Sequence, residues 1–490
     1  MSAPAAFWVG ILAFGLAGCT ANESAVARAF QGVVKDPYAM SGSAETEIHR
    51  FEAVLDEFAV SRSAAEQRQQ FTDAFRRVRI DYVHEVGDRQ LVDAAIRGVR
   101  DLKSPPRAKT STELIEMALD SMLSSLDPHS AYLTPEELRD VRASNAGEFG
   151  GLGIELTMEN NAIKVVSPIE DTPASRSGIK AGDLITHLDQ TPVEGLSLAQ
   201  AVSRMRGRPG SDIKLTLKRA GLGRAFEVTL TRAIIRVQSV RSRAEGDVGY
   251  IRVTSFTEKV ETDVATAIAK IEATVGPELK GYVLDLRNNP GGLLDQAVAL
   301  SDLFLDRGAI VSVRGRRDSR TFEARTGDAA HALPVVVLVN RGSASASEIV
   351  AAALQDHGRA QIMGLRSFGK GTVQTIMPLP REGGLRMTTQ LYYSPTGRAI
   401  QGWGIDPDIV VGTDDGPEAR READLPGAIA ASGPAAPPAV KRPQTTLRED
   451  DCPVAASDDR PLGCALLLIR SGSVATFIAS LGRSDTPPRP

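Results

Sequence analysis

Apolar positions in the first third of the chain recur every three or four residues, a spacing that predicts amphipathic helices. The pattern runs from Phe51 to Glu137 and is clearest in FTDAFRRVRIDYV, LVDAAIRGVRDL and STELIEMALDSML. An Asp127-Pro128 pair near the end of this stretch favours a turn. We therefore expect a helical N-terminal segment over residues 51–140.

The pattern changes after residue 140. Short runs rich in β-branched residues surround a single helical stretch, Leu198–Met205; these runs are GIELTM, AIKVVS, DLITHLD, DIKLTLKR and AFEVTLTR. Five short strands at this spacing predict a small β-rich module that folds separately. We place this module at residues 141–236.

Strands and helices alternate from residue 237 to residue 413. Apolar runs such as GYVLDL and PVVVLVN are each followed by a helical pattern. This alternation predicts a parallel α/β core with helices covering the sheet. Residues 414–490 are expected to form a Pro/Ala-rich linker and a C-terminal extension, whose one short apolar helix is Cys464–Ile469.

Composition narrows the functional class. The chain has 490 residues, 42% of them apolar and 24% charged, which is typical of globular domains, about three at this length. The net charge of −4 is small, so no nucleic-acid partner is expected. The six histidines are scattered and no Cys/His cluster has metal-ligand spacing. We therefore expect neither a metal nor another cofactor.

The N-terminus carries an apolar run, Ala5–Ala17, that is too short to span a bilayer comfortably. It is typical of a secretory signal, although no Lys or Arg precedes it. The ending LAGC resembles the lipobox of bacterial lipoproteins, which predicts a signal peptide over residues 1–18, a lipid on Cys19 and a tether over residues 19–50. A plain signal with a chance cysteine is the alternative.

A lipid on Cys19 predicts a periplasmic protein that is anchored to a bacterial membrane. Thr20 stands where some bacteria place the Asp that retains lipoproteins at the inner membrane, so the outer membrane is favoured. The other two cysteines, Cys452 and Cys464, lie 12 positions apart. In an exported chain two such thiols most often form a disulfide, with two free thiols as the alternative.

Three loops follow the carboxyl ends of expected parallel strands: 287–292, 341–346 and 367–371. Right-handed crossover connections bring successive strand ends to the same edge of a sheet. The three loops should therefore converge at the edge where open α/β sheets bind ligands.

Ser345 lies in the second of these loops, just before a helix. A capping box with Glu348 is its simplest interpretation. The small residues 342–346 and the amides of a helix N-terminus instead favour a nucleophile beside an oxyanion site. Lys370 could serve as its general base, provided that burial lowers the amine pKa from about 10.4. Gln374 could orient the amine by a hydrogen bond.

In the β-rich module, the sequence GGLGIEL at residues 150–156 opens a strand. Consecutive amides in such a loop can bind a carboxylate, and the adjoining strand edge can pair with a peptide. A glycine-rich turn without a ligand is the alternative.

These motifs resemble those of a known family. GLGI, SGIKAGDLI and VSRMRGRPG resemble a PDZ domain. Together with SLDPHSAYL, DLRNNPGG, GSASASEIVAAALQDHGRA and SFGKGTVQ, they resemble the C-terminal processing, or tail-specific, proteases. The resemblance covers about residues 60–411 in the order of the family's motifs.

The resemblance implies a crotonase-like α/β protease core with a helical N-terminal segment and an inserted PDZ domain. It assigns Ser345 as the nucleophile, Lys370 as the general base and Gln374 as the orienting partner. The oxyanion hole would combine the N–H of Ala346 with that of Gly291 or Gly292, a choice that stays open.

The resemblance also implies how substrates are selected. Gly151, Leu152, Gly153 and Ile154 would bind the apolar C-termini of exported proteins, and Arg206 is a candidate for gating. A homo-oligomer or an adaptor protein is compatible with the sequence. A lipid-anchored PDZ scaffold without catalysis is the alternative function, against which the intact Ser345, Lys370 and Gln374 set argues.

Overall fold

The computed structural model describes most of the chain in eleven stretches, which are 40–58, 65–101, 110–159, 162–169, 171–196, 198–236, 238–325, 327–412, 420–431, 445–455 and 458–481. The expected signal peptide (1–18), Cys19 and most of the expected tether lie outside the described residues.

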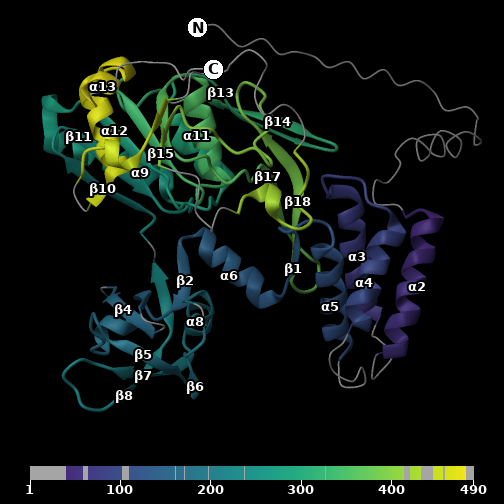
Figure 1. Cartoon of the computed structure of the whole chain (residues 1–490). Coiled ribbons are helices and arrows are strands. Elements are labelled where there is room, and N and C mark those ends of the chain that lie inside the picture. The colour runs from purple at the N-terminus through teal and green to yellow at the C-terminus, as the bar shows by residue number, and fades with distance from the viewer. Residues whose placement is uncertain are drawn as a thin grey trace, which may run out of the picture.

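Four helices form the N-terminal bundle, namely α2 (Gly42–Phe58), α3 (Ala65–Asp81), α4 (Asp88–Arg100) and α5 (Ser111–Ser124) (Figure 1). Helix α2 begins inside the segment expected to be a tether, because buried Ala44 and Ile48 extend the apolar stripe of Phe51 by two turns. At its centre, the rings of Phe51 and Phe71 stack at 3.8 Å. The bundle is thus a packed unit rather than a set of isolated helices.

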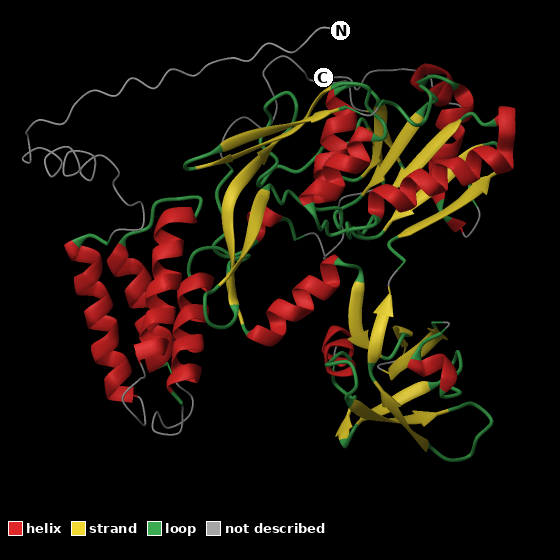
Figure 2. Ribbon diagram, turned by 180° about the vertical axis from the view of Figure 1, so that it is seen from behind, coloured by secondary structure: helices red, strands yellow, loops and turns green. Residues whose placement is uncertain are grey.

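A short strand and a helix connect the bundle to the β-rich module. Strand β1 (Ala131–Leu133) pairs with β18 (Gly384–Tyr393), and helix α6 (Pro135–Asn145) follows β1. Strands β2 (Glu148–Gly151) and β9 (Ala233–Arg236) then pair antiparallel and carry the chain into and out of the module. Figure 2 shows this two-stranded stem between the module and the rest of the protein.

The sheet of the module has six strands, of which five follow the order β3-β4-β5-β7-β8 and the sixth, β6, pairs with β5. The expected strands and the helix at Leu198–Met205 are all present; the elements are β3 (Ile154–Glu159), β4 (Ala162–Pro168), α7 (Pro173–Arg176), β5 (Leu184–Leu188), β6 (Thr191–Pro192), α8 (Leu198–Met205), β7 (Asp212–Lys218) and β8 (Phe226–Thr231). Its buried side chains form their own cluster, separate from those of the core. Strand β3 lies at the edge of this sheet.

The core is a seven-stranded sheet in the order β10-β11-β12-β15-β16-β19-β20, parallel except for β10. Its strands are β10 (Val240–Glu245), β11 (Val248–Val253), β12 (Gly281–Asp285), β15 (Val335–Val339), β16 (Ala360–Gly364), β19 (Ile409–Val411) and β20 (Thr445–Leu447). Alternate residues of β15 point to opposite faces, so that Val335 and Val337 contribute to one hydrophobic cluster and Val336 to the other. Both faces of the sheet are therefore buried.

Helices cover the two faces from different parts of the chain. One face packs against α9 (Val260–Val275), α10 (Leu294–Asp302) and α11 (Ala346–Asp356), and the short 3₁₀ helix η2 (Gly276–Glu278) follows α9. The other face packs against the C-terminal helices α12 (Arg460–Ser471) and α13 (Val474–Ser480), drawn in yellow in Figure 1. Two more 3₁₀ helices, η3 (Glu422–Asp424) and η4 (Glu449–Asp451), lie in the same C-terminal region.

The sequence predicted that the core ends at residue 413 and that a separate extension follows. In the structure, residues of the extension belong to the core. Strand β20 pairs with β19 in the main sheet, and Leu462 and Ile469 of α12 are buried against that sheet. The extension supplies one of the three layers, because a parallel sheet needs both faces covered. Cys452 and Cys464 form a disulfide in this layer, with the sulfur atoms 2.08 Å apart.

A second sheet lies between the core and the bundle. It contains β13 (Gly308–Gly315), β14 (Ser319–Ala324), β17 (Thr372–Pro378) and β18 (Gly384–Tyr393), together with β1. Leu385, Met387 and Leu391 of β18 are buried in the same cluster as the helices of the bundle. The bundle is thereby fixed to the strand pair that follows Lys370.

Candidate active site

The three loops that the sequence placed at one sheet edge do meet there. They follow β12, β15 and β16, which are parallel neighbours in the main sheet. The first and second loops are joined by a bond from the N–H of Ala344 to the carbonyl of Asn289 at 3.0 Å. The second and third are joined by a bond from the N–H of Phe368 to the carbonyl of Ser343 at 3.0 Å.

Ser345 is held in an unusual backbone conformation. Its φ of +56° is in the left-handed region, which costs a non-glycine residue about 1–3 kcal/mol and often marks a functional position. Only half of the expected capping box is made, because the N–H of Ser345 donates to Glu348 at 2.8 Å while the serine side chain makes no capping bond. The hydroxyl is therefore not used to cap α11.

Glu348 connects the candidate nucleophile to the candidate base. Its side chain is fully buried, and the same carboxylate oxygen, Oε2, accepts from the N–H of Ser345 at 2.8 Å and of Lys370 at 2.9 Å. The other oxygen accepts from the Ser367 hydroxyl and the Gly369 N–H. Burial raises the pKa of Glu348 to about 7, although the four donors favour its charged form. One carboxylate thus fixes the two backbones together.

Lys370 is half-buried at this edge. Burial lowers the pKa of its amine, and the charge of Glu422 is the largest opposing influence. Arg386 lowers that pKa further, whereas Asp127 and Glu348 raise it. Among the described residues, the ammonium makes no ion pair. A lysine in such surroundings can lose its proton more easily than one in water.

Gln374 lies on β17, beside a bulge in its pairing with β18. Its side-chain nitrogen donates to the hydroxyls of Thr372 at 2.8 Å and Thr388 at 3.3 Å. The Thr388 hydroxyl in turn donates to buried Asp127 at 3.1 Å. The side-chain nitrogen of Gln374 is thus held by two hydroxyls of its own sheet.

The amides expected to form an oxyanion hole differ in their hydrogen bonds. The N–H of Gly291 donates to Oδ1 of Asn289 at 2.9 Å, so a substrate oxygen would compete with that side chain. The N–H groups of Gly292 and Ala346 have no partner among the described residues. A β-carbon on Gly291 would lie 2.8 Å from that of Ser345, so only glycine fits this close to the nucleophile.

Two residues at the site were not singled out from the sequence. Tyr392 is fully buried; burial raises the pKa of its phenol, and a hydrogen bond with Ser345 opposes that rise. Glu422 comes from the extension, and its buried carboxylate binds Nε2 of His129 at 2.8 Å and Nε2 of Gln401 at 3.1 Å. The SLDPHSAYL motif, which contains His129, was the only sequence signal for the contact between His129 and Glu422.

The candidate peptide-binding residues follow the stem. Gly151 ends β2 and Ile154 begins the edge strand β3. Between them, the carbonyls of Leu152 and Gly153 accept bonds from the N–H groups of Ala174 and Ile169. Gly153 has a φ of +74°, and a β-carbon there would lie 2.3 Å from Thr172. The chain therefore turns sharply where the edge strand begins.

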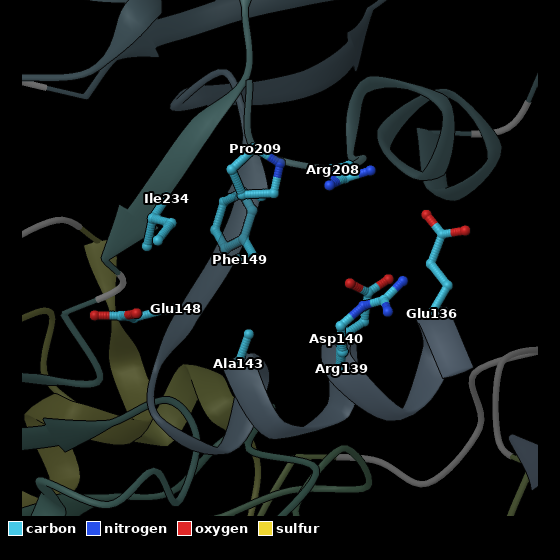
Figure 3. A pocket seen from close by; sticks show the side chains of 10 residues that line it. Glu136, Arg139, Asp140, Ala143, Glu148, Phe149, Arg208, Pro209 and Ile234 are labelled. Carbon is cyan, nitrogen blue, oxygen red and sulfur yellow. The ribbon is translucent and has the colours of Figure 1, made fainter. Parts of the chain in front are cut away.

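Arg206 belongs to the end of the module that faces the stem. Its guanidinium lies 4.7 Å from the centre of the Phe149 ring, on β2. A pocket of about 400 Å³ opens next to it between α6, the stem and residues 208–209 (Figure 3). Figure 3 shows Glu136 and Asp140 of α6 on the side of this pocket opposite Phe149. Arg206 thus contacts the connection to the core rather than the active-site loops.

Two features are absent from the part of the chain that the structure describes. No group of three or more His, Cys, Asp or Glu side chains could hold a metal ion. No single described helix is long and apolar enough to cross a membrane; α12 and α13 reach that length only as a pair bent by 120°.

Comparison with known proteins identifies relatives of both parts. A model of Peptidase family S41 matches residues 247–411, and a PDZ domain model matches residues 150–230. The chain is 51% identical over 348 residues to a carboxy-terminal-processing protease of Bartonella bacilliformis, covering 70% of this chain and 75% of that protein. It is 34% identical over 311 residues to a probable CtpA-like serine protease of Staphylococcus epidermidis, covering 63% and 62%.

Among solved structures, the photosystem II D1 C-terminal processing protease aligns with 71% of this chain and 93% of its own, at 30% identity and a TM-score of 0.45. The matched domains and the relatives define a serine-type peptidase with a PDZ domain. The chain belongs to the carboxy-terminal-processing proteases of peptidase family S41.

Proposed function

We propose that this peptidase cleaves exported proteins with a Ser345–Lys370 dyad after its PDZ domain has bound their apolar C-termini. The shared carboxylate of Glu348 is the observation that carries the proposal, because Oε2 binds the backbones of both residues within 2.9 Å. Such a bridge fixes a nucleophile loop and a base loop in one geometry, which a binding scaffold would not require.

The reaction follows from the positions of these groups. In its neutral form, which burial favours, Lys370 takes the proton of the Ser345 hydroxyl as that oxygen attacks the substrate carbonyl. The N–H of Ala346, with that of Gly291 or Gly292, stabilises the oxyanion. Lys370 then gives the proton to the leaving amine, and water hydrolyses the acyl-enzyme by the same route. Gln374 would keep the amine directed at Ser345.

The PDZ domain supplies substrate selection in this proposal. The edge strand β3 offers a free side for an added peptide strand, and the turn at Leu152–Gly153 offers backbone amides to its terminal carboxylate. Arg206, stacked on Phe149 of the stem, would link occupancy of this groove to the core. The core that receives the peptide is, in our proposal, crotonase-like.

We also propose that the protein is a periplasmic lipoprotein, attached through Cys19 and favouring the outer membrane. The LAGC sequence and the paired Cys452 and Cys464 support export, since disulfides form outside the cytoplasm.

Tail selectivity tests the PDZ part of this proposal. Two model proteins that differ only in their last three residues, Leu-Ala-Ala or Asp-Asp-Asp, should be cleaved at different rates. The apolar tail should lower KM about tenfold or more, because a charged tail loses both apolar contact and the fit to the groove. Equal KM values for the two tails would contradict it, and absent cleavage of both would leave the scaffold function instead.

The charge of Glu422 provides a test of the general base. Activity should rise with pH as Lys370 loses its proton. Glu422→Gln removes the charge that raises the pKa of Lys370 most, so the acid side of the kcat/KM profile should move to lower pH. Asp424→Asn in the same 3₁₀ helix removes an equal charge from an exposed side chain and should leave the profile in place. A shift of the Glu422→Gln profile to higher pH would rule out Lys370 as the titrating base.

A further inference from the structure

The C-terminal extension contains an ion pair that the cleavage mechanism above does not use. Asp459 lies between Cys452 and Cys464 in the sequence and is the N-cap of α12, where its Oδ1 accepts from the N–H of Leu462 at 3.0 Å. The S41 family model ends at residue 411, well before this residue. Asp459 therefore lies outside the residues that the family model matches.

Asp459 binds the guanidinium of Arg287 through two hydrogen bonds of 2.9 and 2.6 Å. Asp285, at the end of β12, binds the same guanidinium through two bonds of 2.9 and 2.6 Å. Burial alone would lower the pKa of Arg287, but the two carboxylates outweigh it and raise the pKa above its usual value. Arg287 is thus fixed between the sheet and the extension by a planar fork on each side.

Arg287 is the first residue of the loop 287–292, which we call the oxyanion loop. The next residue, Asn288, has a left-handed φ of +57°, and its N–H donates to Asn340 at 2.9 Å. The carbonyl of Asn289 then accepts from the Ser347 hydroxyl at 2.9 Å, and Gly291 lies against Ser345. A displacement of Arg287 would therefore move the amides that face the nucleophile.

We propose that Asp459 is a positioning residue for the oxyanion loop and that the Cys452–Cys464 disulfide holds Asp459 in place. Peptide cleavage then depends on the oxidised state of the C-terminal extension. This inference rests on the proposed Ser345 mechanism, since it assigns to the extension the placement of the amides used in that mechanism.

The disulfide closes the short loop that carries Asp459. Both sulfur-bearing residues are buried, and Gly463 next to Cys464 packs so closely on Pro453 that a β-carbon would lie 1.8 Å from the Pro453 carbonyl. Reduction by dithiothreitol breaks the S–S bond, adds two electrons and two protons, and leaves two thiols, while dithiothreitol becomes a cyclic disulfide. The freed segment no longer restrains the start of α12, so Asp459 can leave Arg287.

The substitution Asp459→Asn separates the positioning role from helix capping. Asn caps helices about as well as Asp, so α12 keeps its N-cap. The charge and the two-pronged bond to Arg287 are lost. We expect kcat to fall about 10- to 100-fold, as for small misplacements of catalytic groups, with KM and the melting temperature unchanged. A kcat within twofold of the wild type would overturn the proposal.

Arg470→Ala is the matched control. Arg470 lies at the other end of α12 and binds Asp247 at 2.7 Å, so its loss removes an ion pair between the same helix and the core. This variant should retain wild-type kcat. If Arg470→Ala lowered kcat as much as Asp459→Asn does, the loss of any contact between α12 and the core would be enough to lower kcat. That result would overturn the specific role of Asp459.

A double-mutant cycle tests whether Asp459 acts through Arg287. Arg287→Lys keeps the charge but loses the planar fork. If the two residues act as a unit, the double variant with Asp459→Asn should have the kcat of Arg287→Lys alone. Losses that multiply would overturn the proposed connection.

The redox dependence is measured on the full-length protein with and without dithiothreitol. Reduction should lower kcat of the wild type to the level of the double variant Cys452→Ser/Cys464→Ser, which itself should not respond. Equal activity of the reduced and oxidised proteins would overturn this part. Failure of the proposed function looks different, because Ser345→Ala would then cleave as well as the wild type.

Discussion

Replacing Ser345 by Ala should abolish peptide cleavage, with kcat falling roughly ten-thousand-fold or more, as in other serine peptidases that lose their nucleophile. Ser345 has a left-handed backbone conformation, which is strained because of its β-carbon. Alanine has the same β-carbon, so the substitution leaves this backbone strain unchanged. The hydroxyl also makes no capping bond to α11. The substitution therefore removes the nucleophile and its hydrogen bond with Tyr392, while the backbone contacts of residue 345 stay.

Three measurements check this result on the same two proteins. Cleavage of an apolar-tailed substrate gives kcat, labelling with a fluorophosphonate reports the reactive hydroxyl, and thermal unfolding reports the fold. Ser345→Ala should lose the first two and keep its melting temperature. Cleavage by the Ser345→Ala protein at more than about one-hundredth of the wild-type rate would exclude Ser345 as the nucleophile.

Replacing Lys370 by Ala should lower kcat about 100- to 10,000-fold, the usual contribution of a general base. Lys370→Arg should be equally inactive, because a guanidinium stays protonated and cannot accept the serine proton. The backbone N–H of residue 370 still reaches Glu348 in both variants, so the loop keeps its anchor.

Rescue by a small amine distinguishes a base from a structural cation. Methylamine added to Lys370→Ala should restore part of the activity, with a rate that rises with pH as the free amine forms. Lys370→Arg should show no rescue, since the guanidinium fills the space. Substantial activity of Lys370→Arg would exclude proton transfer by this residue.

The sequence contained enough information to predict that the three loops meet, because the signals for the strands before them are local. Each of the three loops follows an apolar strand, and strand order along the chain places their ends together. The PDZ module was also predictable, since its strands alternate with short turns and α8 has the predicted bounds, Leu198–Met205. Patterns of period 2 and 3.6 placed the strands and helices, whereas the roles of Ser345, Lys370 and Gln374 came from the resemblance to the protease family and stay predictions.

Residues whose role depends on distant contacts were not predictable in this way. Glu422 belongs to a polar stretch of the extension, and only the folded chain shows that its carboxylate is buried against His129. The pairing of β20 with β19 likewise crosses residues 413–444, so nothing local marks Thr445–Leu447 as part of the main sheet. The expected core boundary at residue 413 failed for that reason.

The stem formed by β2 and β9 has a consequence for how such enzymes diversify. Both connections to the PDZ domain run side by side through these strands, and the buried side chains of the domain form a cluster of their own. A different binding domain could be inserted on the same stem without disturbing the packing of the peptidase. The binding specificity of such an enzyme can therefore change, by evolution or by design, while its peptidase core is kept.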